Sequence, residues 1–161
     1  PAAPTPPPLP PKTHSIPVYR VALVKEAPLR QTDRPQMGNS ADAAKILREY
    51  LADTDREHFV ILLLNVKNKV IGINTVSVGS LTSSIAHPRE VFKAAILNNA
   101  AAIILGHNHP SGDPVPSNED LSLTRRLCDC GDILNIKVLD HIIIGEHGRY
   151  VSFVDDGYWN K

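Results

Sequence analysis

One stretch of sequence decides both the fold and the chemistry: Gly106-His107-Asn108-His109-Pro110-Ser111-Gly112-Asp113, followed closely by Ser117-Asn118-Glu119-Asp120. Within it, His107, His109 and Asp120 offer two imidazole nitrogens and one carboxylate oxygen that a loop could fold around a single ion. A structural zinc is closed by four protein ligands, whereas a catalytic zinc keeps one position open for water. These three ligands therefore predict a catalytic site that holds one zinc ion per chain.

The surrounding residues predict how this site is held. Residues 100–105 form a short apolar run that is typical of a buried strand, so the two histidines are expected at its carboxyl end. The loop that follows should be stiff and non-helical, because three prolines lie between His109 and Ser117. A helical pattern then runs from Ser117 to about Gly131, and one of its faces carries Leu121, Thr124, Leu127 and Cys128.

The pair Ser117-x-x-Asp120 has a second interpretation. A serine followed three residues later by an acidic residue is typical of a capping box, in which the two side chains bind free backbone N–H groups at the start of a helix. Capping explains neither the paired histidines nor the seven residues that separate them from Ser117. The conjunction of all four residues is what favours a metal site.

The spacing His107-x-His109, seven residues, Ser117-x-x-Asp120 resembles the JAMM motif of the Jab/MPN metalloproteases. The wider segment, from His87-Pro88-Arg89-Glu90 to Leu139-Asp140-His141, resembles the bacterial RadC branch of that family, and the similarity covers roughly residues 40 to 155. The resemblance implies a zinc-dependent peptidase or isopeptidase with metal-activated water as the nucleophile. It also implies that His107, His109 and Asp120 are the ligands and that Ser117 supports the oxyanion.

The same resemblance implies a glutamate on an earlier strand, which takes up the proton of the water and delivers it to the leaving amine. We align Asn74 with that position, or its neighbour Thr75, and no acidic residue lies between Lys69 and His87. An amide can orient a water but cannot take up its proton. Another group would therefore have to act as the base.

Four further residues are candidates for supporting the site. Glu90 and Asp113 are carboxylates that could replace the glutamate, although an acid at a helix N-terminus and a turn-forming aspartate are the simpler interpretations. Asp140 and His141 could orient a ligand histidine, because metal-bound imidazoles usually donate their other N–H to a carboxylate or carbonyl. Asp140 suits that acceptor role better than His141, and a solvent-facing pair at a strand end is the alternative.

Composition bounds the class of protein. The 161 residues suffice for one domain, and the 17 basic residues equal the 17 acidic ones, so the chain has no basic field for strong non-specific DNA binding. Association with DNA is implied only by the RadC resemblance. The sequence shows neither a membrane span nor a signal peptide, which predicts a cytoplasmic protein whose two cysteines, Cys128 and Cys130, are reduced.

Residues 1–17 are rich in proline and are expected to form a tail or linker ahead of one domain over residues 18–161. We predict a helix from Ser40, which caps it, to about Leu51, and a second helix from Pro88 with Val91, Phe92, Ala95 and Ile96 facing inward. Strands are predicted over residues 18–24, 59–64, 70–78, 137–145 and 150–154, of which the second and third form a hairpin. The fold class is therefore a three-layer α/β domain with a mixed, mainly antiparallel sheet, of cytidine-deaminase-like or Jab/MPN type.

Three functions remain compatible with the sequence. The first is a zinc metallohydrolase that cleaves an amide, peptide or isopeptide bond in a peptide or protein substrate, with Ser117 holding the oxyanion. The second is a noncatalytic RadC-like metal-binding module that serves DNA repair or mobile elements. The third is a ferrous iron site, because two histidines and one carboxylate also suit that ion. The family resemblance favours zinc over iron.

Overall fold

Three helices and five strands make up the domain in this computed structural model, which describes residues 20, 22–26, 35–79 and 86–159. In chain order they are α1 (Ser40–Tyr50), β1 (His58–Leu64), β2 (Val70–Val78), α2 (Pro88–Leu97), β3 (Ala102–Asn108), α3 (Asn118–Leu134), β4 (Lys137–Ile144) and β5 (Tyr150–Ser152). The predicted hairpin and the two helices that precede and follow the histidine motif are all present. The structure therefore confirms the predicted α/β class.

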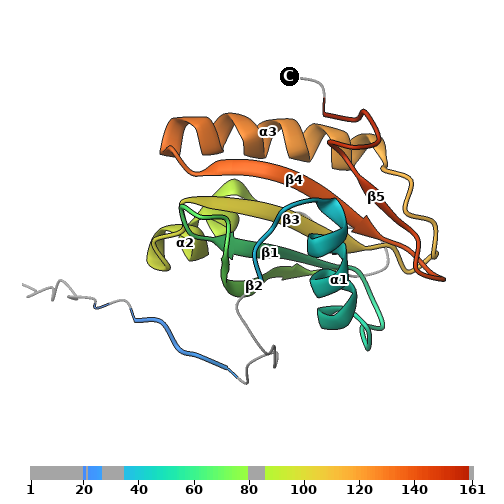
Figure 1. Cartoon of the computed structure of the whole chain (residues 1–161), viewed down its shortest axis with the longest axis horizontal. Coiled ribbons are helices and arrows are strands. Elements are labelled where there is room, and N and C mark those ends of the chain that lie inside the picture. The colour runs from blue at the N-terminus through green and yellow to red at the C-terminus, as the bar shows by residue number, and fades with distance from the viewer. Residues whose placement is uncertain (1–19, 21, 27–34, 80–85, 160–161) are drawn as a thin grey trace, which may run out of the picture.

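The five strands form a single sheet in the order β2-β1-β3-β4-β5 (Figure 1). Only β3 and β4 run parallel, and α3 connects them as the crossover, while all other neighbours are antiparallel. Strand β1 pairs with both β2 and β3, so the hairpin lies beside the strand that carries the histidines. This arrangement confirms a mixed, mainly antiparallel sheet.

The two faces of the sheet are covered by different helices. Alternate residues of β1 point to opposite faces. Val60, Leu62 and Leu64 pack into the core with α1, whereas Phe59, Ile61 and Leu63 pack into the core with α2 and α3. Because helices cover both faces, β1 and β3 are buried almost throughout and read as continuous apolar runs. The structure thus has the three predicted layers.

Helix ends differ from the predictions in detail. The N-cap of α1 is Asn39, whose side chain forms a capping box with Asp42, and not Ser40. Ser40 Oγ instead hydrogen-bonds to Asp155. Pro88 begins α2 as predicted, but Ile96 is 53% exposed and does not face the core. The last turn of α3 extends to Leu134, where Asn135 ends it in a left-handed conformation with φ of 57°.

The N-terminal predictions are tested only in part. Arg20 and residues 22–26 are exposed and carry no strand, so the part of the predicted strand over 18–24 that the structure describes is wrong. The remaining positions of that strand, and the proline-rich residues 1–17, lie outside the described residues. Among the described residues, no helix has the length and apolar character needed to cross a membrane.

Gly106 allows α1 to approach β3 closely, just before the first histidine of the motif. A Cβ atom at this position would lie 2.6 and 2.7 Å from the two terminal methyl carbons of the fully buried Leu47. We expect Gly106→Ala to lower the free energy of unfolding by about 1 to 3 kcal/mol, because the packed core must shift. We expect Leu47→Ala to cost about 2 to 5 kcal/mol.

Urea unfolding of the single and double variants measures the coupling between these two residues. The double variant should lose less stability than the sum of the single losses, because the new methyl group occupies the space that Leu47 leaves. Gly72→Ala is the matched control, since its Cβ would approach only Leu63, at 3.3 Å. Additive effects of Gly106→Ala and Leu47→Ala would contradict this account of the packing.

Candidate metal centre

The carboxyl end of β3 delivers both histidines of the motif. His107 lies within the strand, and His109 is the first residue after its end. The two histidines are two residues apart in an extended chain, so their side chains point to the same side. The chain remains extended up to His109, whose backbone N–H donates to Ile144 O at 3.0 Å, as if β3 still paired with β4. The strand therefore presents two imidazoles on one side, toward α3.

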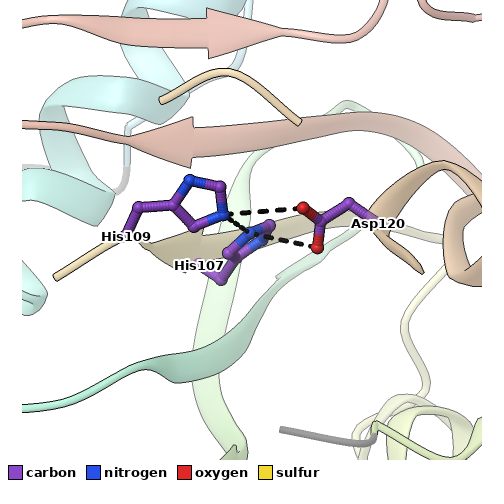
Figure 2. A group of neighbouring side chains, drawn as sticks. All are labelled: His107, His109 and Asp120. Carbon is purple, nitrogen blue, oxygen red and sulfur yellow. Dashed lines mark hydrogen bonds and ion pairs between the residues drawn. The ribbon is translucent and has the colours of Figure 1, made fainter. Parts of the chain in front are cut away.

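The first turn of α3 brings a carboxylate to the same point. Figure 2 shows the side chains of His107, His109 and Asp120 converging from β3, the loop after it and α3. The Nε2 atoms of the two histidines are 2.9 Å apart, and Asp120 places Oδ1 3.4 Å from His107 Nε2 and Oδ2 3.5 Å from His109 Nε2. These residues form the one group of histidine, cysteine or acidic side chains in the described part of the chain that is close enough to share a metal ion.

The Nε2 atom of His109 faces the cluster with a free lone pair in the neutral ring. Its Nδ1 lies 2.7 Å from the backbone carbonyl of Asp113, which can only accept a hydrogen bond. Nδ1 therefore carries the proton, and Nε2 is left without one. The Nε2 atoms of His107 and His109 lie 2.9 Å apart beside an ionised carboxylate, so a shared proton or a metal ion can join them. Two nitrogens and one oxygen suit a divalent metal, so the donor set fits the predicted ion.

Metal binding needs neutral imidazoles and an ionised carboxylate, and His107 and Asp120 meet these requirements. Burial lowers the pKa of His107 to about 4. Burial acts to raise the pKa of Asp120, but His109, His107 and Ser117 together hold that pKa well below its usual range. The pKa of His109 is raised, mainly by its interaction with Asp120, so a metal ion would displace a proton from this ring.

Ser117 and Asp120 form the predicted capping box and belong to the cluster as well. Ser117 donates to Asp120 Oδ2 from its hydroxyl at 2.7 Å and from its backbone N–H at 2.8 Å. Asp120 N–H donates back to Ser117 Oγ at 3.1 Å. The two interpretations of this pair are therefore compatible, because the cap fixes the carboxylate that faces the histidines. The hydroxyl proton of Ser117 is directed at Asp120, and an oxyanion role for Ser117 stays a prediction.

The predicted supporting residues divide into two groups. His141 Nε2 lies 2.8 Å from His107 Nδ1, and the Asp113 backbone carbonyl holds His109 as described above. The structure therefore brings His141 and the main chain of Asp113 to the ligands. Asp140 instead binds Ser152 Oγ at 2.6 Å and the backbone N–H groups of His141 and Val154, so the acceptor role expected of Asp140 belongs to His141.

Asn74 lies on β2, which β1 separates from β3, and Glu90 lies on α2. Asn74 pairs with Ile61 on the outer strand β2, two residues along β1 from Phe59, which is the residue that pairs with His107. Glu90 lies in the first turn of α2 and forms ion pairs with Lys93 and Arg89. This is the helix-stabilising arrangement that was the simpler interpretation of Glu90.

A carboxylate that the sequence reasoning missed, Glu57, lies next to the cluster. Phe59 pairs with His107, and His58 N–H donates to Asn108 Oδ1 at 2.8 Å, so the segment that carries Glu57 is held beside the residue between the two histidines. Burial raises the pKa of the partly buried Glu57, the negative charge of Asp120 raises it further, and His109 acts to lower it. These mutual effects show that the Glu57 carboxylate is electrostatically coupled to both ligands.

Asn108, between the two histidines, holds the segment that carries Glu57. Its side-chain amide donates to Arg56 O at 2.9 Å and to Thr54 Oγ1 at 3.2 Å, and its carbonyl accepts from His58. Glu57 lies two residues before the strand expected over 59–64, so the pairing of that strand with residues 100–105 was the signal that could have found it. A groove of about 390 Å³ opens beside Asp120 and is lined by Ala86, Asn118, Glu119, Ser122, Leu123 and Arg126.

Comparison with known proteins places this geometry in a family. Residues 37–158 match the RadC-like JAB domain. A UPF0758 protein of Caldanaerobacter subterraneus is 56% identical over 119 residues, which are 74% of this chain and 51% of the relative. A UPF0758 protein of Desulfitobacterium hafniense is 55% identical over 124 residues, covering 77% of this chain and 54% of the relative. A Bacillus cereus UPF0758 protein is 52% identical over 130 residues, covering 81% and 57%.

The chain thus spans about half the length of the curated relatives that it matches. The matched segment contains every element of the sheet and all the residues of the cluster. Because the match covers most of the chain, the protein belongs to the RadC-like JAB domain family, a branch of the JAB/MPN superfamily.

Proposed function

We propose that this domain is a zinc-dependent hydrolase that cleaves an amide bond in a peptide or protein substrate. The observation that carries the proposal is the convergence of His107, His109 and Asp120. An additional carboxylate, Glu57, lies at the same end of the neighbouring strands β1 and β3. A metal site without a base would suit a binding module. A metal site with a coupled carboxylate has the parts that amide hydrolysis requires.

His107, His109 and Asp120 would hold the zinc ion, which supplies the Lewis acid that activates water and polarises the substrate carbonyl. Glu57 would accept a proton from the attacking water and transfer it to the leaving amine. Its raised pKa suits the first step, because a stronger base takes up the proton of the water more readily. The groove beside Asp120 would bind part of the substrate.

Ser117 would act first by holding Asp120, as its two hydrogen bonds to Oδ2 indicate. An oxyanion role requires the hydroxyl hydrogen to leave Asp120 when substrate is bound, and we propose this only as an additional role. Asn74 is not part of the proposed mechanism, because its register position is on the outer strand and Glu57 occupies the coupled position.

Metal content tests the proposed ligands. The purified protein should contain about one zinc per chain by elemental analysis, and His109→Ala and Asp120→Ala should lose it, because two ligands cannot retain the ion against a chelator. His147→Ala is the control, since this histidine is 85% exposed and pairs only with Glu146 among the contacts of the described chain. Equal zinc in the wild type and in His109→Ala would contradict the site.

The role of Glu57 is tested by separating metal binding from turnover. Glu57→Gln should retain zinc but lower kcat on a panel of peptides and isopeptide-linked substrates by about 10² to 10⁴, because the amide cannot take up a proton. Asp132→Asn is the control, as it removes an exposed carboxylate at the far end of α3, outside the cluster and the groove. Turnover in Glu57→Gln that equals wild type would reject Glu57 as the base. A zinc-loaded wild type that cleaves no member of the panel would favour the noncatalytic module.

A further inference from the structure

Thr124 hydrogen-bonds to the backbone of one metal-ligand candidate, Asp120, and to the histidine that contacts another, His107. Thr124 itself is not one of the candidate ligands. Its hydroxyl lies 2.6 Å from the backbone carbonyl of Asp120, one helical turn earlier, and 2.6 Å from Nδ1 of His141. His141 continues to His107 through the contact of 2.8 Å between Nε2 and Nδ1. A continuous chain of hydrogen bonds therefore joins the backbone of one ligand to the ring of another.

The direction of each hydrogen bond follows from the number of protons available. A threonine hydroxyl has one hydrogen, and the Asp120 carbonyl can only accept, so Thr124 must donate to Asp120 O. Thr124 Oγ1 then accepts from His141, whose Nδ1 carries the ring proton. The neutral ring of His141 has a bare Nε2, which must accept from Nδ1–H of His107. Nε2 of His107 is thereby left free, and this is the atom that faces His109 and Asp120.

Burial limits these groups to hydrogen-bond partners within the protein. His107 and His141 are fully buried, and Thr124 is 4% exposed. Phe59 stacks on His107 with ring centroids 5.9 Å apart, and Phe153 packs against His141 at 4.6 Å. In the reversed pattern the bare Nδ1 of His141 would face the Thr124 oxygen at 2.6 Å with no hydrogen between them, because that hydroxyl already donates to Asp120 O. A buried acceptor left unpaired costs about 1 to 3 kcal/mol, so this pattern is disfavoured. The reversed pattern would place a proton on His107 Nε2 and block a metal ion.

We propose that Thr124 is a positioning residue whose single hydroxyl fixes the metal-binding tautomer of His107 through His141 while it ties the backbone of Asp120. The inference rests on the metal-binding part of the proposed function and is independent of catalysis. Through this hydroxyl, α3 orients His107 on β3 as well as Asp120 in its own first turn. A residue that contacts no metal thus sets the zinc affinity of the site.

The test compares the wild type with Thr124→Val, which has the same shape but no hydroxyl, and Thr124→Ser, which keeps the hydroxyl. The probe is zinc alone, titrated against a chromophoric chelator. Loss of a group that orients a ligand typically weakens metal binding about 10- to 100-fold, and we expect this for Thr124→Val, with Thr124→Ser close to wild type. Thr75→Val is the matched control, because it removes a hydroxyl bonded to Tyr50 at 2.9 Å on the opposite face of the sheet.

Long-range ¹H–¹⁵N NMR spectra of the metal-free protein provide a reading that does not depend on zinc. Both His107 and His141 should carry their proton on Nδ1 in the wild type, and Thr124→Val should shift His107 toward the Nε2–H form. A wild-type His107 with its proton on Nε2 would overturn the proposal, whether or not any variant folds. Zinc affinity as weak in folded Thr124→Ser as in Thr124→Val would also overturn it.

A wild type that binds no zinc would overturn the proposed function, while the tautomers of the metal-free protein would still decide the role of Thr124. Conversely, wild-type tautomers that differ from this assignment would leave zinc binding by His107, His109 and Asp120 intact. The two proposals therefore fail in distinguishable ways.

Discussion

The pairing of β3 with both of its neighbours is the constraint on which the whole site depends. Antiparallel pairing with β1 sets Phe59 opposite His107 and brings the segment that carries Glu57 alongside the histidines. Parallel pairing with β4 sets His141 opposite Leu105, on the face that also holds His107. A shift of either register by one residue would turn these side chains to the other face, toward α1. The positions of the site residues are therefore set by the register of the two strand pairs.

Helix α3 completes the site because its first turn serves two purposes. The capping box between Ser117 and Asp120 satisfies backbone donors that every helix start leaves free, and it also fixes the rotamer of the carboxylate. One turn later, Thr124 ties the same helix to His141. The local requirement of helix capping and the requirement of a preorganised ligand are therefore met by the same atoms. Because Asp120 serves both purposes, the pattern Ser117-x-x-Asp120 fits a capping box and a metal-binding motif alike.

The imidazoles of His107 and His141 form part of a buried hydrogen-bond network in the metal centre. His107 and His141 have no access to water, so each must find its hydrogen-bond partners within the protein. Desolvation lowers the pKa of both rings and keeps them neutral. A neutral His107 whose tautomer is set by His141 can bind a metal ion without first losing a proton or rotating.

Much of this architecture was determined by local sequence alone. The apolar runs of β1 and β3, the hairpin, the proline at the start of α2, the His-x-His pair at a strand end and the Ser117–Asp120 pair were all readable, because each depends on neighbours within a few residues. Glu57, the exchange of roles between Asp140 and His141, and the part played by Thr124 were decided only by the tertiary structure. Each depends on which residues face each other across strands or between a helix and a sheet, and such pairing over 17 to 50 residues leaves no local pattern in the sequence.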